Sequence, residues 1–103
     1  MSGLKSLFTA RVFSLHGDVT RLTLSGAPAT DQATLSKAVG GDIEIIPLGP
    51  TESLALHAEG KLLNLPTNAV ATAIARRHDA LLPGDYIAGV AVAIPNEALY
   101  DAS

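Results

Sequence analysis

The chain of 103 residues carries a net charge of −3 at pH 7, and its composition is 48% hydrophobic and 17% charged. This length fits a single domain, residues 1–103, and this composition excludes an intrinsically disordered chain. The negative charge argues against unassisted binding to duplex nucleic acid, which needs clustered Lys and Arg, and the lack of cysteine excludes disulfides, thiol catalysis and thiolate metal sites.

Neither a membrane segment nor a signal peptide is expected. The longest apolar run, residues 86–94, is shorter than the roughly 20 residues that a helix needs to cross a bilayer. The residues after Lys5 form neither an apolar signal region nor a small-residue cleavage site. We therefore expect a cytoplasmic protein that makes no contact with a membrane.

The first predicted element is a β-hairpin over residues 7–24, preceded by residues 1–6, which are expected to fray. Two stretches in which residue character alternates flank the turn sequence His16, Gly17 and Asp18. Alternation on both sides of a glycine turn is typical of two antiparallel strands.

A short helix is predicted next, over residues 31–39. Thr30 or Asp31 is a suitable N-cap, because the side-chain oxygen of either residue can accept from N–H groups of the first turn. Gly40 and Gly41 then end the helix.

Residues 42–48 predict a strand that ends, or reaches the edge of a sheet, at Pro47. Its side chains would face two ways, with Ile43 and Ile45 on one side and Glu44, Ile46 and Leu48 on the other. Glu44 stands on an otherwise apolar face, where an unpaired carboxylate is costly. Either Glu44 lies near the exposed end of the strand, or it is a functional carboxylate on a sheet face.

Residues 54–59 predict the returning strand. Its inward residues would be Leu54, Leu56 and Ala58, and its outward residues would be Ala55, His57 and Glu59. Gly60 and Lys61 turn the chain. The leucines that follow, Leu62, Leu63 and Leu65, are expected to cover the core.

A second helix is predicted over residues 68–79, with Thr67 or Asn68 as its N-cap after Pro66. One stripe of this helix contains Val70, Ala73, Ile74 and Arg77, with Ala69 beside it, and the apolar residues of the stripe are expected to face the sheet. Residues 86–94 are apolar on both sides, which predicts a central strand covered on both faces. A tail follows, with a helical turn expected over residues 97–100.

The predicted order β-β-α-β-β-α-β indicates an α+β fold. We expect a mixed or antiparallel sheet of about five strands with two helices packed on it. The alanine-rich apolar composition also makes a homodimer a reasonable expectation.

Part of the sequence resembles a known family. An Ile-Glu strand at Ile43, a Glu-Gly-Lys turn at Glu59, an Asn and Ala-Thr helix start at Asn68 and an Ile-Ala-Gly segment at Ile87 make up the similarity. This pattern resembles the small phage- and plasmid-borne proteins catalogued as domain of unknown function 3846. It covers about residues 39–94 and departs from the family at His57 and Ala58, where acidic or amide residues are usual. The resemblance implies a bacteriophage or mobile-element origin and implies no reaction.

Several polar residues could meet near the glycine turn. His57 and Glu59 share a strand face, Lys61 follows them, and Asn68 and Thr72 begin the second helix. A helix N-terminus beside a lysine can bind an anion. The candidate ligand-binding residues are therefore Glu44, His57, Glu59, Lys61, Asn68 and Thr72, the alternative being a solvated strand face beside an ordinary cap.

No catalytic constellation stands out in the sequence. His16, His57 and His78 lack the spacing of a metal site, and no nucleophile motif or phosphate-binding loop is present. We therefore expect no metal, no cofactor and no catalytic residue.

The leading functional hypothesis is a non-enzymatic bacteriophage accessory protein. It would bind a host protein or sequester a small anionic ligand in the host cytoplasm, and so counter host defence. One alternative is a small hydrolase or nucleotide-processing enzyme that uses Glu44 or Glu59 as a general base. The other is a weak nucleic-acid-binding module. Its candidate contacts are Arg11, Arg21, Arg76 and Arg77.

Overall fold

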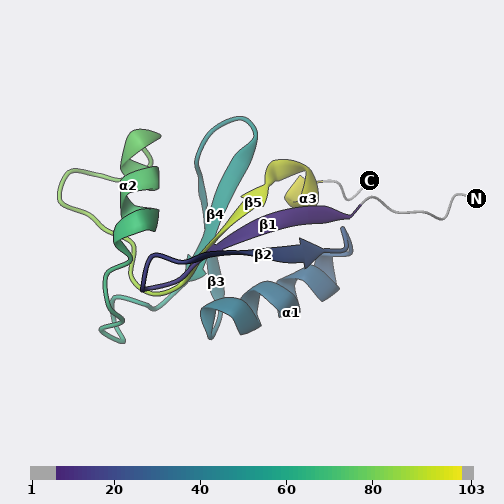
Figure 1. Cartoon of the computed structure of the whole chain (residues 1–103), viewed down its shortest axis with the longest axis horizontal. Helices are drawn as coiled ribbons and strands as arrows, with labels where there is room; N and C mark the ends of the chain where they lie inside the picture. The colour runs from purple at the N-terminus through teal and green to yellow at the C-terminus, as the bar shows by residue number, and fades with distance from the viewer. Residues whose placement is uncertain (1–6, 101–103) are drawn as a thin grey trace, which may run out of the picture.

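The computed structural model describes residues 7–100, so the expected fraying of residues 1–6 lies outside the described part. This part forms a five-stranded antiparallel sheet with helices packed against it (Figure 1). The strands are β1 (Phe8–Phe13), β2 (Val19–Leu24), β3 (Ile43–Pro47), β4 (Glu52–His57) and β5 (Ala91–Pro95). The helices are α1 (Pro28–Val39), α2 (Ala69–Arg77) and α3 (Asn96–Tyr100). The predicted α+β fold is confirmed, as is the order of the predicted strands and helices.

The last strand lies in the middle of the sheet, whose spatial order is β2-β1-β5-β4-β3. Each of the two hairpins, β1–β2 and β3–β4, pairs through its inner strand with β5. The residues of β5 from Ala91 to Ile94 are all buried. The predicted central position of this strand is therefore confirmed, and β2 and β3 are left as the edges.

The central strand begins later than predicted, at Ala91, and residues 86–90 are not part of it. Gly89 has a φ of 88°, in the left-handed region, which interrupts a strand. A Cβ at Gly89 would lie 2.9 Å from Leu65 Cδ1, so the glycine also allows Leu65 to approach the backbone closely.

The side chains of the sheet contribute to two separate apolar layers, one on each face of the sheet. On one face, Ala91 and Ala93 pack with Leu54, Leu56 and residues of α2. On the opposite face, the other side chains of β5 pack beneath α1 and α3. This second layer contains Val92, Ile94, Ala55, Leu35, Val39 and Ala98. We call these the α2 face and the α1 face; α1 lies along the sheet, while α2 stands at one end of it (Figure 1).

The prediction of which β4 side chains are exposed is wrong in part, because helices cover both faces of the sheet. Ala55 and His57 were expected to face outward, but both are buried because α1 covers their side of the sheet. The leucines after the turn show the opposite error. Leu62 is 81% exposed and Leu63 is 56% exposed, so neither covers the core.

The first helix starts at Pro28, earlier than predicted, because proline is well suited to the first helical position. Ala27 occupies the N-cap position without a side-chain hydrogen bond, so the prediction of Thr30 or Asp31 as cap is wrong. The Asp31 carboxylate instead accepts from the backbone N–H groups of Ser25 and Gly26, both at 2.8 Å. Asp31 thus fastens the preceding loop to the helix.

Of the two predicted caps, Thr67 and Asn68, the second helix uses Asn68, because Asn68 Oδ1 accepts from the backbone N–H of Ala71 at 3.0 Å. Its Nδ2 donates to the carbonyl oxygens of Phe13 at 2.9 Å and Gly89 at 3.0 Å. The side chain is only 1% exposed. One amide therefore joins α2, β1 and the segment before β5.

The face of α2 that packs inward is rotated from the predicted stripe but shares two of its residues. Val70 and Ile74 pack against the core as predicted, whereas Ala73 is exposed and the buried residues are Ala71, Thr72 and Ala75. The rotation follows from polar anchoring, because Asn68 holds the start of the helix and Thr72 Oγ1 accepts from the backbone N–H of Ile87 at 2.9 Å. Helical periodicity alone carries no information on these contacts.

Replacing Asn68 by alanine is expected to lower the free energy of unfolding by about 2–3 kcal/mol, because it removes a cap and leaves two buried carbonyl groups without a donor. Urea denaturation followed by circular dichroism measures the change. Thr67→Ala is the matched control, since the Thr67 side chain is exposed and does not cap the helix. Equal destabilisation by the two variants would contradict the assigned role of Asn68.

Candidate functional site

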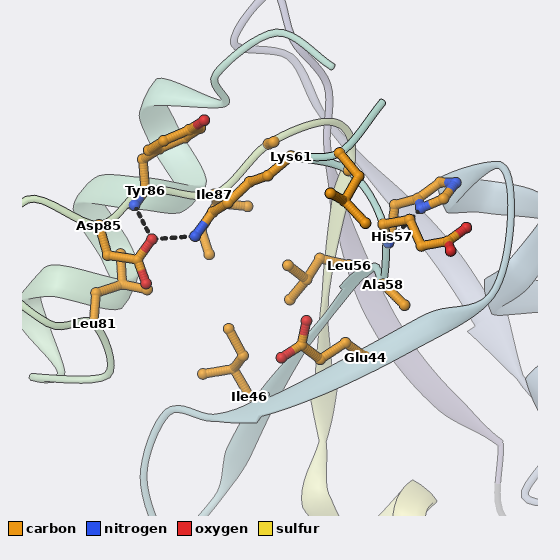
Figure 2. A pocket seen from close by; sticks show the side chains of 14 residues that line it. Glu44, Ile46, Leu56, His57, Ala58, Lys61, Leu81, Asp85, Tyr86 and Ile87 are labelled. Atoms are coloured by element: carbon orange, nitrogen blue, oxygen red, sulfur yellow. Dashed lines mark hydrogen bonds and ion pairs between the residues drawn. The ribbon is translucent and has the colours of Figure 1, made fainter. Parts of the chain in front are cut away.

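A pocket of about 140 Å³ opens on the α2 face near the edge of the sheet (Figure 2). Glu44 and Ile46 of β3 form one wall, and Leu56 of β4 lies between that wall and the opposite side. The turn after β4, Leu81 and residues 85–88 complete the lining. The pocket is therefore built from three separate stretches of the sequence, 44–46, 56–62 and 81–88.

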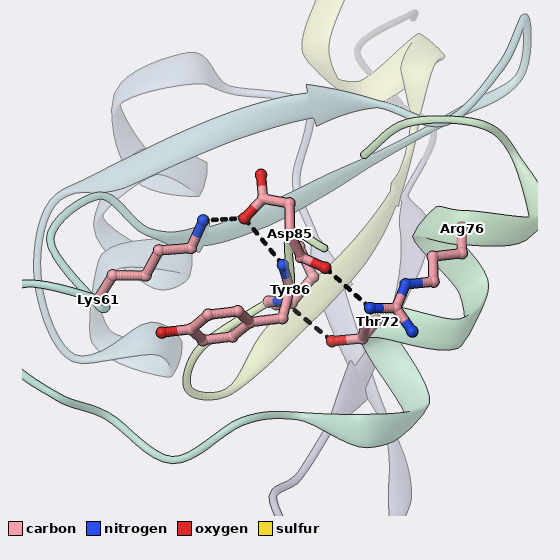
Figure 3. A network of polar contacts seen from close by, with 6 residues as sticks. Lys61, Thr72, Arg76, Asp85 and Tyr86 are labelled. Carbon is pink, nitrogen blue, oxygen red and sulfur yellow. Dashed lines mark hydrogen bonds and ion pairs between the residues drawn. The ribbon is translucent and has the colours of Figure 1, made fainter. Parts of the chain in front are cut away.

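An ion pair joins the two loops that close the pocket. Lys61 Nζ donates to Asp85 Oδ1, which also accepts from the backbone N–H of Tyr86 at 2.8 Å (Figure 3). Lys61 Nζ also lies 5.0 Å from the centroid of the Tyr86 ring, within the range of a cation–π contact. These contacts hold the turn against the segment that leads into β5.

The same network reaches α2. Arg76 Nη2 donates to the backbone carbonyl of Asp85 at 3.0 Å, near the C-terminal end of the helix (Figure 3). The hydrogen bond from Lys61, followed by that from the Tyr86 N–H, holds the pKa of the Asp85 carboxyl below its ordinary value of 3.8. Asp85 is therefore ionised at neutral pH.

Glu44 lies near the beginning of β3, so the expected position near an exposed strand end is confirmed, and it also lines the pocket. It is the second residue of β3, its side chain points to the cavity in Figure 2, and the residue is exposed. Within residues 7–100, no hydrogen bond or ion pair engages its carboxylate. The exposed position explains how an acidic residue is tolerated on this face, and it leaves the carboxylate accessible to a ligand.

His57 and Glu59 line the same pocket but differ from the arrangement expected from the sequence. The His57 ring packs under Gly41, where an added Cβ would lie 2.5 Å from Nε2. His57 Nδ1 accepts from the backbone N–H of Glu59 at 3.0 Å. The ring points away from the cavity (Figure 2), so His57 shapes the turn.

Asn68 and Thr72 lie outside the pocket. Both side chains are buried and are used in backbone hydrogen bonds, as described above. The N-terminus of α2 thus packs against Phe13 and Gly89 instead of lying over the Glu59 turn. Of the six candidate residues, the structure brings together Glu44, His57, Glu59 and Lys61.

The residues opposite Lys61 were not among the candidates from the sequence. Asp85, Tyr86 and Ile87 line the pocket, although residues 86–94 were predicted only as a strand. A lone aspartate after Pro83 and Gly84 gives no sign that it pairs with a lysine 24 residues away. The only available signal for this pair was the opposite charge of Lys61 and Asp85 in two predicted turns.

The residues that line the pocket carry a net negative charge. Glu44, Glu59 and Asp85 contribute three carboxylates against the single ammonium of Lys61, which gives a formal charge of −2 with His57 neutral. Such a lining favours a cationic group and disfavours an anion. This observation argues against the small anionic ligand suggested by the sequence.

Apolar side chains gather around the opening. Leu62 and Tyr86 line the pocket although they are exposed. We call Leu62 and Tyr86 the apolar rim. Exposed apolar groups beside a polar pocket are common where a partner binds.

The four arginines considered for nucleic-acid binding are only partly available. Arg11 pairs with Glu52 through two contacts of 2.9 and 3.0 Å. By strand register, this pair crosses the sheet over Ala93, which is 1% exposed. Arg76 is bonded to the backbone of residue 85. The structure therefore uses two of these arginines for internal contacts.

No known protein family, curated protein or solved structure matches this chain. Within residues 7–100, no helix is long and apolar enough to cross a membrane, and no group of three or more His, Asp or Glu is placed to hold a metal ion. The geometry of the pocket is therefore the basis for the functional argument.

Lys61→Met is expected to raise the pKa of Asp85 toward its ordinary value, because it removes the largest cause of the lowering. The folded-state pKa lies below the unfolded one, so Asp85 stabilises the fold above the unfolded value, and this contribution is lost as pH falls through the folded pKa. The wild type should exceed the variant in stability at pH 7, with a difference that shrinks below about pH 4.

Carbon-detected NMR titration of Asp85 and urea denaturation at several pH values measure the two effects. Lys37→Met serves as the control, since Lys37 is an exposed residue of α1. An Asp85 pKa that stays unchanged when Lys61 is replaced would contradict the assigned ion pair.

Proposed function

We propose that this chain is a non-enzymatic binding protein that holds a basic, partly apolar segment of a protein partner in the pocket beside β3. The observation that carries the proposal is the combination of a negatively charged pocket with an exposed apolar rim. A cationic side chain would enter beside Glu44, and its apolar neighbours would contact the rim.

Energetics support a protein partner over a small molecule. Leu62 and Tyr86 expose apolar surface beside the pocket, and covering it with a partner removes that surface from water, at about 25 cal/mol per Å². A small ion would leave both side chains exposed. A peptide segment that carries both apolar and basic side chains would use both features.

The arrangement of the carboxylates disfavours the hydrolase alternative. A general base must be held within hydrogen-bonding reach of the proton that it removes, and its orientation is usually fixed by a neighbour. Within the described residues, neither Glu44 nor Glu59 has a side-chain hydrogen bond that orients it. Both are exposed, so their carboxylates remain well solvated.

The bacteriophage resemblance noted in the sequence fits this proposal. A protein carried by a mobile element would find its partner among proteins of the bacterial host, and an effect on host defence would follow from occupying that partner. Binding rather than chemistry is the mechanism we propose.

Selection of random displayed peptides against the immobilised full-length chain tests the proposal. Enriched peptides should contain Lys or Arg beside apolar residues. Glu44→Gln should weaken them by about fivefold, the effect of losing one partly exposed charge pair. Leu62→Ser should also weaken binding, because it removes apolar contact area.

Glu97→Gln is the matched control, since Glu97 is an exposed carboxylate on α3, outside the pocket. Fluorescence anisotropy measures each affinity. Enrichment of acidic peptides, or equal binding to wild type and both pocket variants, would refute the proposal.

A further inference from the structure

Among residues 7–100, the backbone groups on the outer edge of β3 have no pairing strand, and they follow a defined pattern. The N–H of Leu48 bonds to the carbonyl of Glu52, and the N–H of Ala58 bonds to the carbonyl of Asp42. Because hydrogen-bonded pairs alternate along antiparallel strands, the backbone groups of residues 44 and 46 face β4. Those of Ile43 and Ile45 therefore point away from the sheet, as does Pro47, which has no N–H to offer.

This edge has a pocket on each face. The pocket described above lies on the α2 face, beside Glu44 and Ile46. A second pocket, of about 150 Å³, lies on the α1 face beside Ile43 and Ile45. Its other walls come from α1 and α3. They include Pro28, Leu35, Ala98 and Leu99.

The two pockets match the side-chain alternation of a strand. Residues of an added strand would point alternately to the two faces of the sheet. A residue opposite Glu44 would lie on the face of the negative pocket, beside the Glu44 side chain, and its two neighbours would lie on the face of the apolar pocket, beside Ile43 and Ile45. Backbone hydrogen bonds would supply affinity, and the pockets would supply sequence preference.

We infer that the β3 edge binds an extended segment of the partner as a sixth, antiparallel strand, with a Lys or Arg opposite Glu44 and apolar residues on both sides of it. This inference rests on the proposed function, because it uses the same pocket. It adds the conformation of the bound segment, its register and the order apolar–basic–apolar.

A second copy of this chain fits the edge poorly. Pairing two β3 strands symmetrically about residue 44 would place the two Glu44 carboxylates directly opposite each other, which is repulsive. Pairing about Ile45 would set Pro47, which lacks an N–H, opposite Ile43. Glu44 and Pro47 therefore oppose pairing of this edge with a second copy. A basic strand from a partner does not meet the same repulsion.

The opposite edge of the sheet differs in charge. By the same alternation, Val19, Arg21 and Thr23 of β2 direct their backbone groups outward. Arg21 would repel a basic strand. Charge thus distinguishes the two edges for this class of ligand.

NMR titration of the ¹⁵N-labelled full chain with the capped peptide Ser-Thr-Val-Lys-Val-Thr-Ser tests the inference. In the inferred register, both valine N–H groups face β3 and the lysine N–H faces solvent. Methylating the two valine nitrogens should lower the affinity by about tenfold or more, because two hydrogen bonds are lost. Methylating the lysine nitrogen should change it little.

The backbone signals of Ile43 and Ile45 should shift most in the titration, and replacing the peptide lysine by glutamate should abolish the shifts. Binding that depends on Glu44 but not on methylation of the valines would overturn strand addition and leave the proposed function standing. An absence of shifts at β3 at the highest peptide concentration would also overturn strand addition, whereas the proposed function is judged separately by the selected peptides.

Discussion

The structure depends on the burial of one strand on both of its faces. β5 carries apolar side chains on both of its faces. It buries both sets by lying between two hairpins, with α1 over one face and α2 near the other. Its small residues matter as much as its apolar character. Ala91 and Ala93 leave room for longer side chains from neighbouring strands, and the Arg11–Glu52 pair extends across this surface. Placing the strand in the centre also determines which strands become edges.

The candidate site follows from that arrangement. β3 is an edge because β4 occupies the position beside β5, and the turn after β4 then rises next to the segment that leads into β5. Lys61 and Asp85 connect these two loops and close the pocket around Glu44. The free backbone edge, the negative pocket and the apolar rim consequently lie together. A partner segment that is extended, basic and apolar would satisfy all three features.

Local signals in the sequence predicted much of the fold. The order of elements, the central last strand, the edge position at Pro47 and the Asn68 cap each depend on residues close in sequence, and the structure bears them out. Failures arose where distant contacts decide the outcome. The left-handed φ of Gly89 delays β5 and lets the distant Leu65 approach the backbone. Asp85 joins the site through Lys61, a pairing that no local pattern encodes.

Backbone amide hydrogen exchange of the free protein, measured by NMR, tests the central claim most directly: the outer edge of β3 is open and available to a partner. The account predicts fast exchange at Ile43 and Ile45, whose N–H groups face outward, and slower exchange at Glu44 and Ile46, whose N–H groups bond to β4. Equal protection at all four amides, unchanged on dilution, would show that another segment of the chain covers the edge and would contradict the account.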